Sequence, residues 1–210
     1  MRMDKKIRPA FLALALLGCL AIVWLCTVVG VASVPVSEAN RILLNRLFHL
    51  PVSLDGITDG TVTIIWKIRF PRILLGFLAG AVLAVSGTGY QSIFKNPMAD
   101  PFVLGVSSGA GLGAAIGIVG RFTFRIWILN STTLLAFAGS FVALFLVYRI
   151  SQTGMRVRIT TLLLAGVAVN STLSALMSFL MMMNKQSMDQ IMFWTMGTLN
   201  GKGWSQISAV

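Results

Sequence analysis

The sequence predicts an all-α, polytopic bundle of transmembrane helices, and three observations support this. The 210 residues are 56% hydrophobic and 11% charged, with a mean hydropathy of +0.85, whereas soluble domains carry about 25% charged residues. Five stretches without a charged residue are long enough to cross about 30 Å of hydrocarbon. The Lys and Arg residues lie in short segments between these stretches, as topology signals do. The net charge of +11 therefore does not indicate a nucleic-acid partner.

The predicted spans are Pro9–Val34, Ile73–Phe94, Pro101–Gly120, Ile126–Tyr148 and Ile159–Asn184. A sixth span begins near Trp204, and the sequence reaches Val210 inside it. We therefore expect five complete spans and the start of a sixth, in one transmembrane domain over residues 1–210 whose C-terminal half is absent.

The first span resembles a lipoprotein signal peptide at its start, "MRMDKKIRPAFLALALLGC". However, its apolar run continues without a charge to Val34, which is longer than a signal peptide requires. We therefore favour a membrane span. Cys19 and Cys26 lie on one face of it and have neither a disulfide framework nor a metal-binding spacing.

Positive charge indicates the orientation. With a cytoplasmic N-terminus, the inner segments Met1–Pro9, Lys95–Asp100 and Arg149–Arg158 carry eight Lys or Arg in 25 residues, and the outer segments carry nine in 61. The positive-inside rule therefore favours a cytoplasmic N-terminus. In the first outer segment, "SEANRILLNRLFHL" has leucines at helical spacing and predicts a short external helix, with His49 in a structural role.

A turn with explicit signals separates the second and third spans. Asn96 precedes Pro97, which ends a helix because the residue before proline is disfavoured in the α region. Asp100 can then cap the next helix, with Pro101 at its first position. The glycines that follow are therefore predicted to lie inside a helix.

These glycines recur every fourth residue, and the preceding span has a similar stripe: Gly105, Gly109, Gly113 and Gly117, and Gly76, Gly80, Ala84 and Thr88. A nucleotide-binding glycine motif lies between a strand and a helix, with an acidic residue about 20 positions later. No Asp or Glu occurs between Asp100 and Asp189. Small residues at this spacing instead let transmembrane helices approach closely, so we interpret the glycines as packing residues.

Polar residues gather on one face of the fifth span: Asn170, Ser171, Ser174 and Ser178. They could line a wet path for a solute, or they could form hydrogen bonds between helices. No Asp, Glu, Lys or Arg lies within a span, which disfavours an ion-coupled carrier. At the mouth of the second span, Arg69 and Arg72 flank Pro71, which fits a first helical turn. These arginines could be interfacial anchors or a docking point for acidic groups.

Three segments carry a resemblance to a known family: "RFPRILLGFLAGAVLAVSGTGYQSIFKNPMADPFVLGVSSGAGLGA", "TTLLLAGVAVNS" and "FWTMGTLNGKGW". They resemble the permease subunits of bacterial ABC importers for iron-siderophores, haem and cobalamin, which are type II importers. The resemblance implies about ten helices in a full subunit, which works as a homodimer or a paralogous heterodimer in the cytoplasmic membrane. It further implies two ATP-binding subunits that hold ATP and magnesium, an extracytoplasmic solute-binding protein, and no cofactor on this chain.

The same resemblance suggests roles for particular residues. Arg69 and Arg72 match the arginines that meet the binding protein. Ile159, Thr160 and Thr161 match the cytoplasmic gate, and the fifth helix matches the lining of the translocation path. Iron chelate is the default cargo, with haem and cobalamin open.

Three alternatives remain at this stage. A secondary carrier or an exporter would need ionisable groups at membrane depth or a fused ATPase domain, and neither is present in these residues. A truncated, inactive permease would carry the same motifs. A membrane-embedded enzyme would need a cluster of His, Asp or Cys facing water, and the sequence predicts neither a catalytic nor a metal-binding residue.

Overall fold

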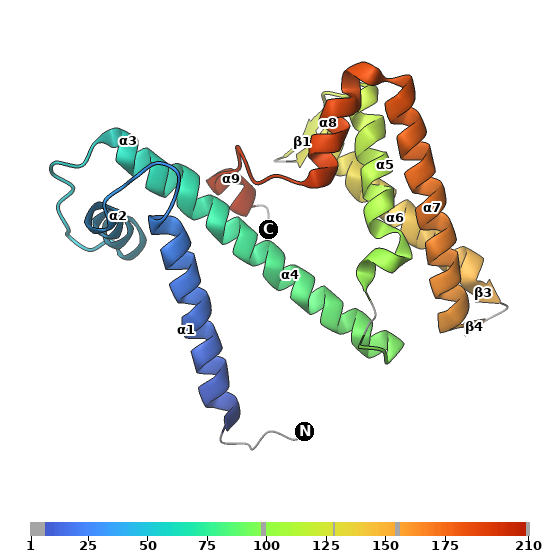
Figure 1. The fold of residues 1–210 in the computed structure, drawn as a ribbon, viewed down its shortest axis with the longest axis horizontal. Coiled ribbons are helices and arrows are strands. Elements are labelled where there is room, and N and C mark those ends of the chain that lie inside the picture. The colour runs from blue at the N-terminus through green and yellow to red at the C-terminus, as the bar shows by residue number, and fades with distance from the viewer. Residues whose placement is uncertain (1–6, 98–99, 128, 154–155, 209–210) are drawn as a thin grey trace. The chain divides into compact units, whose positions relative to one another are not determined.

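The computed structural model describes residues 7–97, 100–127, 129–153 and 156–208, and these are mostly helical (Figure 1). Four helical segments in this part of the chain are long and apolar enough to cross a membrane: Pro9–Val28, Asp59–Phe94, Ser131–Ser151 and Ile159–Met183. The predicted all-α, polytopic transmembrane fold is confirmed, although one of the five predicted spans is a shorter helix, Val106–Val119.

The chain forms two compact units. Unit 1 comprises Met1–Ala81 and Leu199–Val210, and unit 2 comprises Val82–Thr198. The elements of unit 1 are α1 (Ile7–Val28), α2 (Val36–Phe48), α3 (Asp59–Val62), the π-helical η1 (Thr63–Arg69), the first half of α4 (Phe70–Phe94) and α9 (Trp204–Ile207). Those of unit 2 are the rest of α4, the 3-10 helix η2 (Pro101–Leu104), α5 (Val106–Val119), β1 (Arg125–Ile126), β2 (Leu129–Asn130), α6 (Ser131–Ser151), β3 (Gln152–Thr153), β4 (Arg156–Val157), α7 (Ile159–Met183) and α8 (Lys185–Met196).

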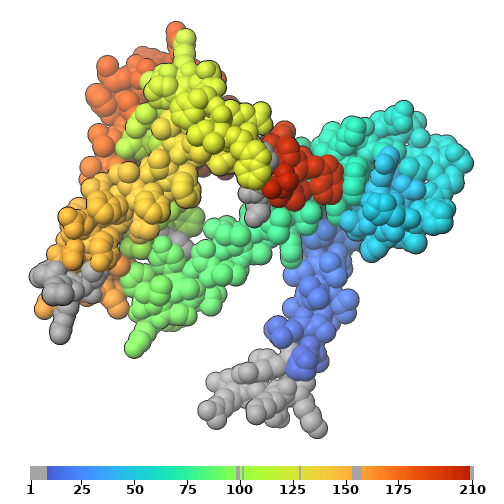
Figure 2. Space-filling model, turned by 180° about the vertical axis from the view of Figure 1, so that it is seen from behind, coloured from blue at the N-terminus to red at the C-terminus, as the bar shows by residue number. Residues whose placement is uncertain are grey.

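In unit 1, α1 and α2 meet at their adjoining ends. Trp24 Nε1 donates to Asn40 Oδ1 at 2.8 Å, and Val28 packs with Ile42 and Leu43 in a buried core. The short helix predicted after the first span is confirmed as α2, and its external location stays a prediction. Figure 2 shows α1, in blue, extending away from the rest of unit 1, with its leucines exposed, as expected of a lipid-facing helix. The first span is shorter than predicted, because α1 ends at Val28 and not at Val34.

The prediction that Pro71 lies in the first turn of the second span is wrong. The chain is already helical from Asp59, and Pro71 lies inside the continuous segment that ends at Phe94. Proline in a helix interior removes a hydrogen bond and crowds the preceding turn. Here the π-helical turn η1 immediately precedes Phe70, and its wider i to i+5 bonding gives the ring room.

One side chain from far along the sequence completes this proline-interrupted helix. The Phe70 N–H donates to the Ile65 carbonyl, and Pro71 has no N–H, so the Trp66 carbonyl lacks a helical donor. Trp204 Nε1 donates to that carbonyl at 2.8 Å. The Trp204 ring also lies 4.7 Å from that of Trp66 and 5.7 Å from that of Phe70. The start of the predicted sixth span is thereby attached to the second.

The third predicted span, Pro101–Gly120, is not a single helix. Asp100 accepts a hydrogen bond from the Phe102 N–H and caps η2, as the sequence suggested. Gly105 then adopts a φ of 74°, a left-handed conformation that ends a helical turn. The prediction that Gly105 belongs to the helical stripe is therefore wrong. The 14 residues of α5 rise only about 21 Å at 1.5 Å per residue.

The fourth span begins at Ser131, five residues later than predicted. Residues 125–126 and 129–130 form an antiparallel pair in which Arg125 pairs with Asn130 and Ile126 pairs with Leu129. Asn130 then caps α6, because its side chain accepts from the Thr133 N–H at 2.9 Å. The fifth predicted span corresponds to α7.

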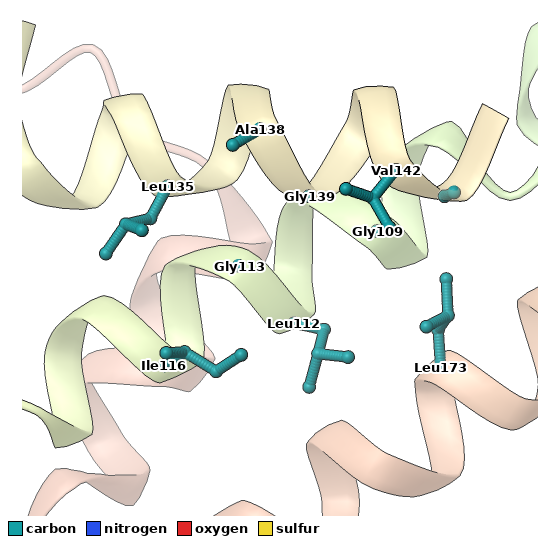
Figure 3. Close-up of a pocket in the computed structure, with 10 residues that line it drawn as sticks. Gly109, Leu112, Gly113, Ile116, Leu135, Ala138, Gly139, Val142 and Leu173 are labelled. Atoms are coloured by element: carbon teal, nitrogen blue, oxygen red, sulfur yellow. The ribbon is translucent and has the colours of Figure 1, made fainter. Parts of the chain in front are cut away.

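A glycine seam joins α5 to α6 at the centre of unit 2 (Figure 3). A Cβ on Gly109 would lie 2.5 Å from the Gly139 carbonyl oxygen, and one on Gly113 would overlap the Leu135 carbonyl. The two backbones therefore touch, as in other small-residue interfaces between membrane helices. Gly117 also faces α6, next to Thr132 and Leu135.

The stripe on the preceding span has looser surroundings. A Cβ on Gly76 would make ordinary contact with Leu199 Cδ1 at 3.4 Å, and one on Gly80 would meet nothing within 4 Å. The close packing predicted for both stripes is thus found between α5 and α6 and not at Gly80.

We expect Gly113→Ala to destabilise the protein by about 1–3 kcal/mol, because the added methyl group overpacks a backbone contact. Gly80→Ala is the matched control. It should be neutral or stabilising by up to about 1 kcal/mol, since its methyl group enters open space and alanine restricts the unfolded chain. Thermal unfolding in detergent micelles measures both, and equal effects would contradict the glycine seam.

Candidate functional site

A cleft of about 520 Å³, with a lining that is mostly apolar and partly polar, lies in unit 2 between the start of α5, the middle of α7 and the end of α8. Ten residues line it: Phe102, Ser107, Ser108, Ala110, Gly111, Asn170, Ser174, Met177, Trp194 and Thr195. None of these ten carries a formal charge, so the lining offers hydroxyl and amide groups beside aromatic rings and a thioether.

Small residues on α5 make room for the cleft. A Cβ on Gly111 would lie 2.9 Å from Met177 Sδ, and the neighbouring lining positions on α5 are serines and an alanine. Gly166 similarly admits the backbone of η2 against α7, since a Cβ there would meet the Val103 carbonyl. The cleft therefore exists because one face of α5 lacks large side chains.

Two of the four residues predicted for a translocation path line this cleft. Asn170 and Ser174 are one turn apart on α7 and face it. Ser171 and Ser178 are exposed and do not line it, and the Ser178 hydroxyl donates to the Ser174 carbonyl at 3.0 Å.

The sequence did not predict the other polar and aromatic residues that line the cleft. Ser107 and Ser108 come from α5, and Trp194 and Thr195 come from α8. The adjacent serines in "GVSSGAG" were the available signal. The residues from α8 belong to a short amphipathic helix whose position beside α5 no local pattern indicates.

The predicted gate residues Ile159, Thr160 and Thr161 form the first turn of α7. Ile159 and Thr160 are exposed, Thr161 is half-buried, and the residue before them, Arg158, makes no side-chain cap. Thr161 precedes Asn170 by nine residues, so the gate turn lies about 14 Å along α7 from the cleft.

The turn predicted between the second and third spans links α4 to η2. The Asn96 N–H donates to the Gln91 carbonyl at 3.2 Å, and α4 has ended at Phe94. Pro97 follows as predicted, and Pro101 opens η2.

Arg69 is engaged by its own chain. Its guanidinium donates to the carbonyls of Thr27 at 3.5 Å and Val28 at 3.1 Å, and also to that of Ala32. The first two are carbonyls at the end of α1, which lack intrahelical donors. Gly30 admits the guanidinium, because a Cβ there would lie 2.6 Å from Arg69 Cζ.

Arg72 has different surroundings, three residues further along. It is half-buried, and its Nε has no hydrogen-bond partner among the described residues. Two arginines that the sequence treats alike are therefore distinguished by the structure: one holds the end of α1, and the other has an unused donor.

Comparison with known proteins shows which family and which relatives this chain resembles. A model of the FecCD transport family matches residues 16–210. The cobalamin import system permease protein BtuC of Halobacterium salinarum is 42% identical over 154 residues, which are 73% of this chain and 41% of that protein. The vitamin B12 import system permease protein BtuC of Escherichia coli (strain K12 / DH10B) is 37% identical over 154 residues, covering 72% and 46% respectively.

The uncharacterized ABC transporter permease protein YvrB of Bacillus subtilis is 31% identical over 187 residues, or 85% of this chain and 50% of that protein. A solved structure of a metal-chelate type ABC transporter in an inward-facing conformation aligns with a TM-score of 0.62 at 26% identity, covering 82% of this chain and 55% of the other. The chain thus spans about half the length of the curated relatives that it matches.

Arg69→Met and Arg72→Met provide a matched test of the two arginines. Arg69→Met should destabilise the protein by about 1–3 kcal/mol, because it removes the donors of buried or partly buried carbonyls. Arg72→Met should have little effect, since the Nε that it removes has no partner. The midpoint of thermal unfolding in detergent measures both, and equal shifts would exclude a special role for Arg69 at the end of α1.

Proposed function

Because the chain belongs to the FecCD transport family, as its motifs led us to expect, we propose that it acts in the membrane permease of an ATP-driven importer for a metal chelate. The observation that carries this proposal is the cleft against α7, because it gathers Asn170 and Ser174 with an uncharged, mostly apolar and partly aromatic lining. Such a lining suits a large solute that must be released again.

The proposed mechanism is alternating access. A solute-binding protein delivers cargo from outside, and two partner subunits bind and hydrolyse ATP with magnesium, so this chain needs no cofactor of its own. The permease pairs with a second copy or a paralogue, and its N-terminus lies in the cytoplasm. The gate turn Ile159–Thr161 and the cleft residues Asn170 and Ser174 lie on one helix, α7, so movement of α7 would couple cargo release to the cytoplasmic side.

The lining chemistry favours one class of cargo. Anionic chelates are held by Arg or Lys, and none of the ten lining residues is basic. Hydroxyl and amide groups beside Trp194, Phe102 and Met177 instead suit a bulky chelate with amide groups and apolar faces. Two of the relatives described above are named for cobalamin or vitamin B12 import, so we propose a cobalamin-type chelate ahead of an iron-siderophore or haem.

Of the two arginines proposed to dock the binding protein, Arg69 and Arg72, one is better suited to that role. Arg69 already donates to three backbone carbonyls, and moving it would expose the end of α1. Arg72 is the better candidate for an acidic group of the binding protein, since no hydrogen bond within the described residues engages its side chain, whose Nε is itself buried.

Uptake by the native host tests the function. Deleting the gene should abolish ATP-dependent accumulation of radiolabelled cyanocobalamin, and restoring it should recover accumulation. Purification of the natively expressed protein in mild detergent should recover an ATPase subunit. Accumulation that survives ATP depletion and stops when the proton gradient is collapsed would contradict an ABC importer. Loss of ferric-siderophore uptake alone would overturn the choice of cargo.

Ser174→Trp should reduce uptake at least tenfold, because the indole fills part of the cleft. Ser178→Trp is the matched control one turn further along α7, where the side chain is exposed and does not line the cleft. Uptake is measured at equal protein abundance in the membrane. Similar losses in both variants would show that the cleft is not the path.

Arg72→Glu should weaken capture of the binding protein about tenfold or more, since reversing a charge at an interface costs several kcal/mol. Arg46→Glu, at an exposed position on α2, is the control and should change capture little. Affinity is measured on permease in nanodiscs at low and high salt. If only Arg46→Glu weakens capture, the docking surface lies on α2.

A further inference from the structure

The short hairpin between α5 and α6 exposes an unusual concentration of aromatic surface. Phe122, Phe124, Ile126 and Trp127 are all exposed, and Trp127 is 78% exposed. We refer to these four residues as the aromatic hairpin. Phe122 and Phe124 contact one another, with ring centroids 6.4 Å apart, but the rings do not pack into either buried core of the described residues.

The aromatic hairpin is held firmly to the helices that it joins. The Phe122 N–H donates to the Gly117 carbonyl at 3.2 Å, and the Ser131 hydroxyl donates to the Phe122 carbonyl. Arg125 Nε donates to the Trp127 carbonyl at 3.1 Å. Its exposed rings are thus presented on a braced turn and not on a loose loop.

The glycine seam fixes the level of the aromatic hairpin in a membrane. Gly109 lies beside Ala143, and Gly117 lies beside Thr132, so the end of α5 is level with the start of α6. The 21 residues of α6 rise about 31 Å, which matches the hydrocarbon thickness of about 30 Å. A spanning α6 therefore begins at one membrane surface and holds the aromatic hairpin there.

Charge indicates what covers these rings. Arg121 precedes the aromatic hairpin and Arg125 lies within it, while no acidic residue occurs between Asp100 and Asp189. Aromatic rings beside arginines are typical of the headgroup layer, where the rings meet the acyl boundary and the cations meet phosphates. A soluble partner would instead have to cover a large apolar patch next to lipid.

We propose that the aromatic hairpin is a membrane-surface anchor: its rings enter the lipid interface, and Arg121 and Arg125 bind the phosphates of anionic lipid headgroups. The anchor fixes the depth of the α5–α6 pair, whose shorter member is too short to span by itself. This inference rests on α6 crossing the membrane and is independent of the cargo or the ATPase.

Spin labels in the full chain test the anchor. In a Cys19→Ala, Cys26→Ala background, a nitroxide is placed by Trp127→Cys, with Phe124→Cys as a second site. Gln186→Cys is the matched control, because Gln186 is exposed and lies at the same end of unit 2, in a cavity that it lines together with Arg121. The protein is reconstituted in vesicles of phosphatidylethanolamine and phosphatidylglycerol.

The label at 127 should collide with oxygen several-fold more, relative to a water-soluble nickel chelate, than the label at 186. Equal ratios at the two sites would overturn the proposal and place the aromatic hairpin in water. Protection of the 127 label from both reagents would also overturn it, and would indicate that protein covers the rings.

Varying the charge of the lipid headgroups distinguishes the role of the arginines from that of the aromatic rings. Arg121→Gln with Arg125→Gln should shift the 127 label toward water in vesicles containing phosphatidylglycerol, and should not do so in vesicles of phosphatidylcholine alone. The same shift in both vesicles, or a shift in neither, would exclude recognition of anionic headgroups by these arginines.

Discussion

The fold depends on supplying hydrogen-bond donors to backbone carbonyls where its helices are interrupted. Hydrocarbon offers no replacement for a lost backbone bond, so each interruption needs a donor from the protein. Trp204 supplies one to the Trp66 carbonyl, which Pro71 leaves unpaired. Arg69 supplies others at the end of α1. These two side chains come from the two different stretches of unit 1, and together they connect the end of α1, the π-helical turn η1 and α9.

In unit 2, the small residues of α5 serve two purposes. Gly109, Gly113 and Gly117 bring α5 against α6, where close packing substitutes for the hydrophobic drive that lipid cannot give. Gly111 and the serines before it face the other way and leave the cleft open. A helix built from larger residues would fill the cleft and separate the pair, so the same composition provides both the scaffold and the site.

Identical residues acquire different roles through their surroundings. Arg69 and Arg72 differ by three positions, which on a regular helix would place them on one face. Arg69, however, closes the π-helical turn and reaches the α1 terminus, while Arg72 follows the proline. The π turn thus separates a structural arginine from one whose buried Nε has no hydrogen-bond partner among the described residues.

The sequence by itself determined the membrane class, the short helix α2, the family, and most ends of the spans α4, α6 and α7 to within a few residues, because hydropathy, caps and motifs are local properties. It also placed Asn170 and Ser174 on one face of α7. Only the tertiary structure decided that Gly105 breaks the third span, that α6 is the partner of the α5 glycines, and that Trp194 and Thr195 join the cleft. Each of these depends on which helix lies opposite, and the pattern of a single helix contains no information about its neighbour.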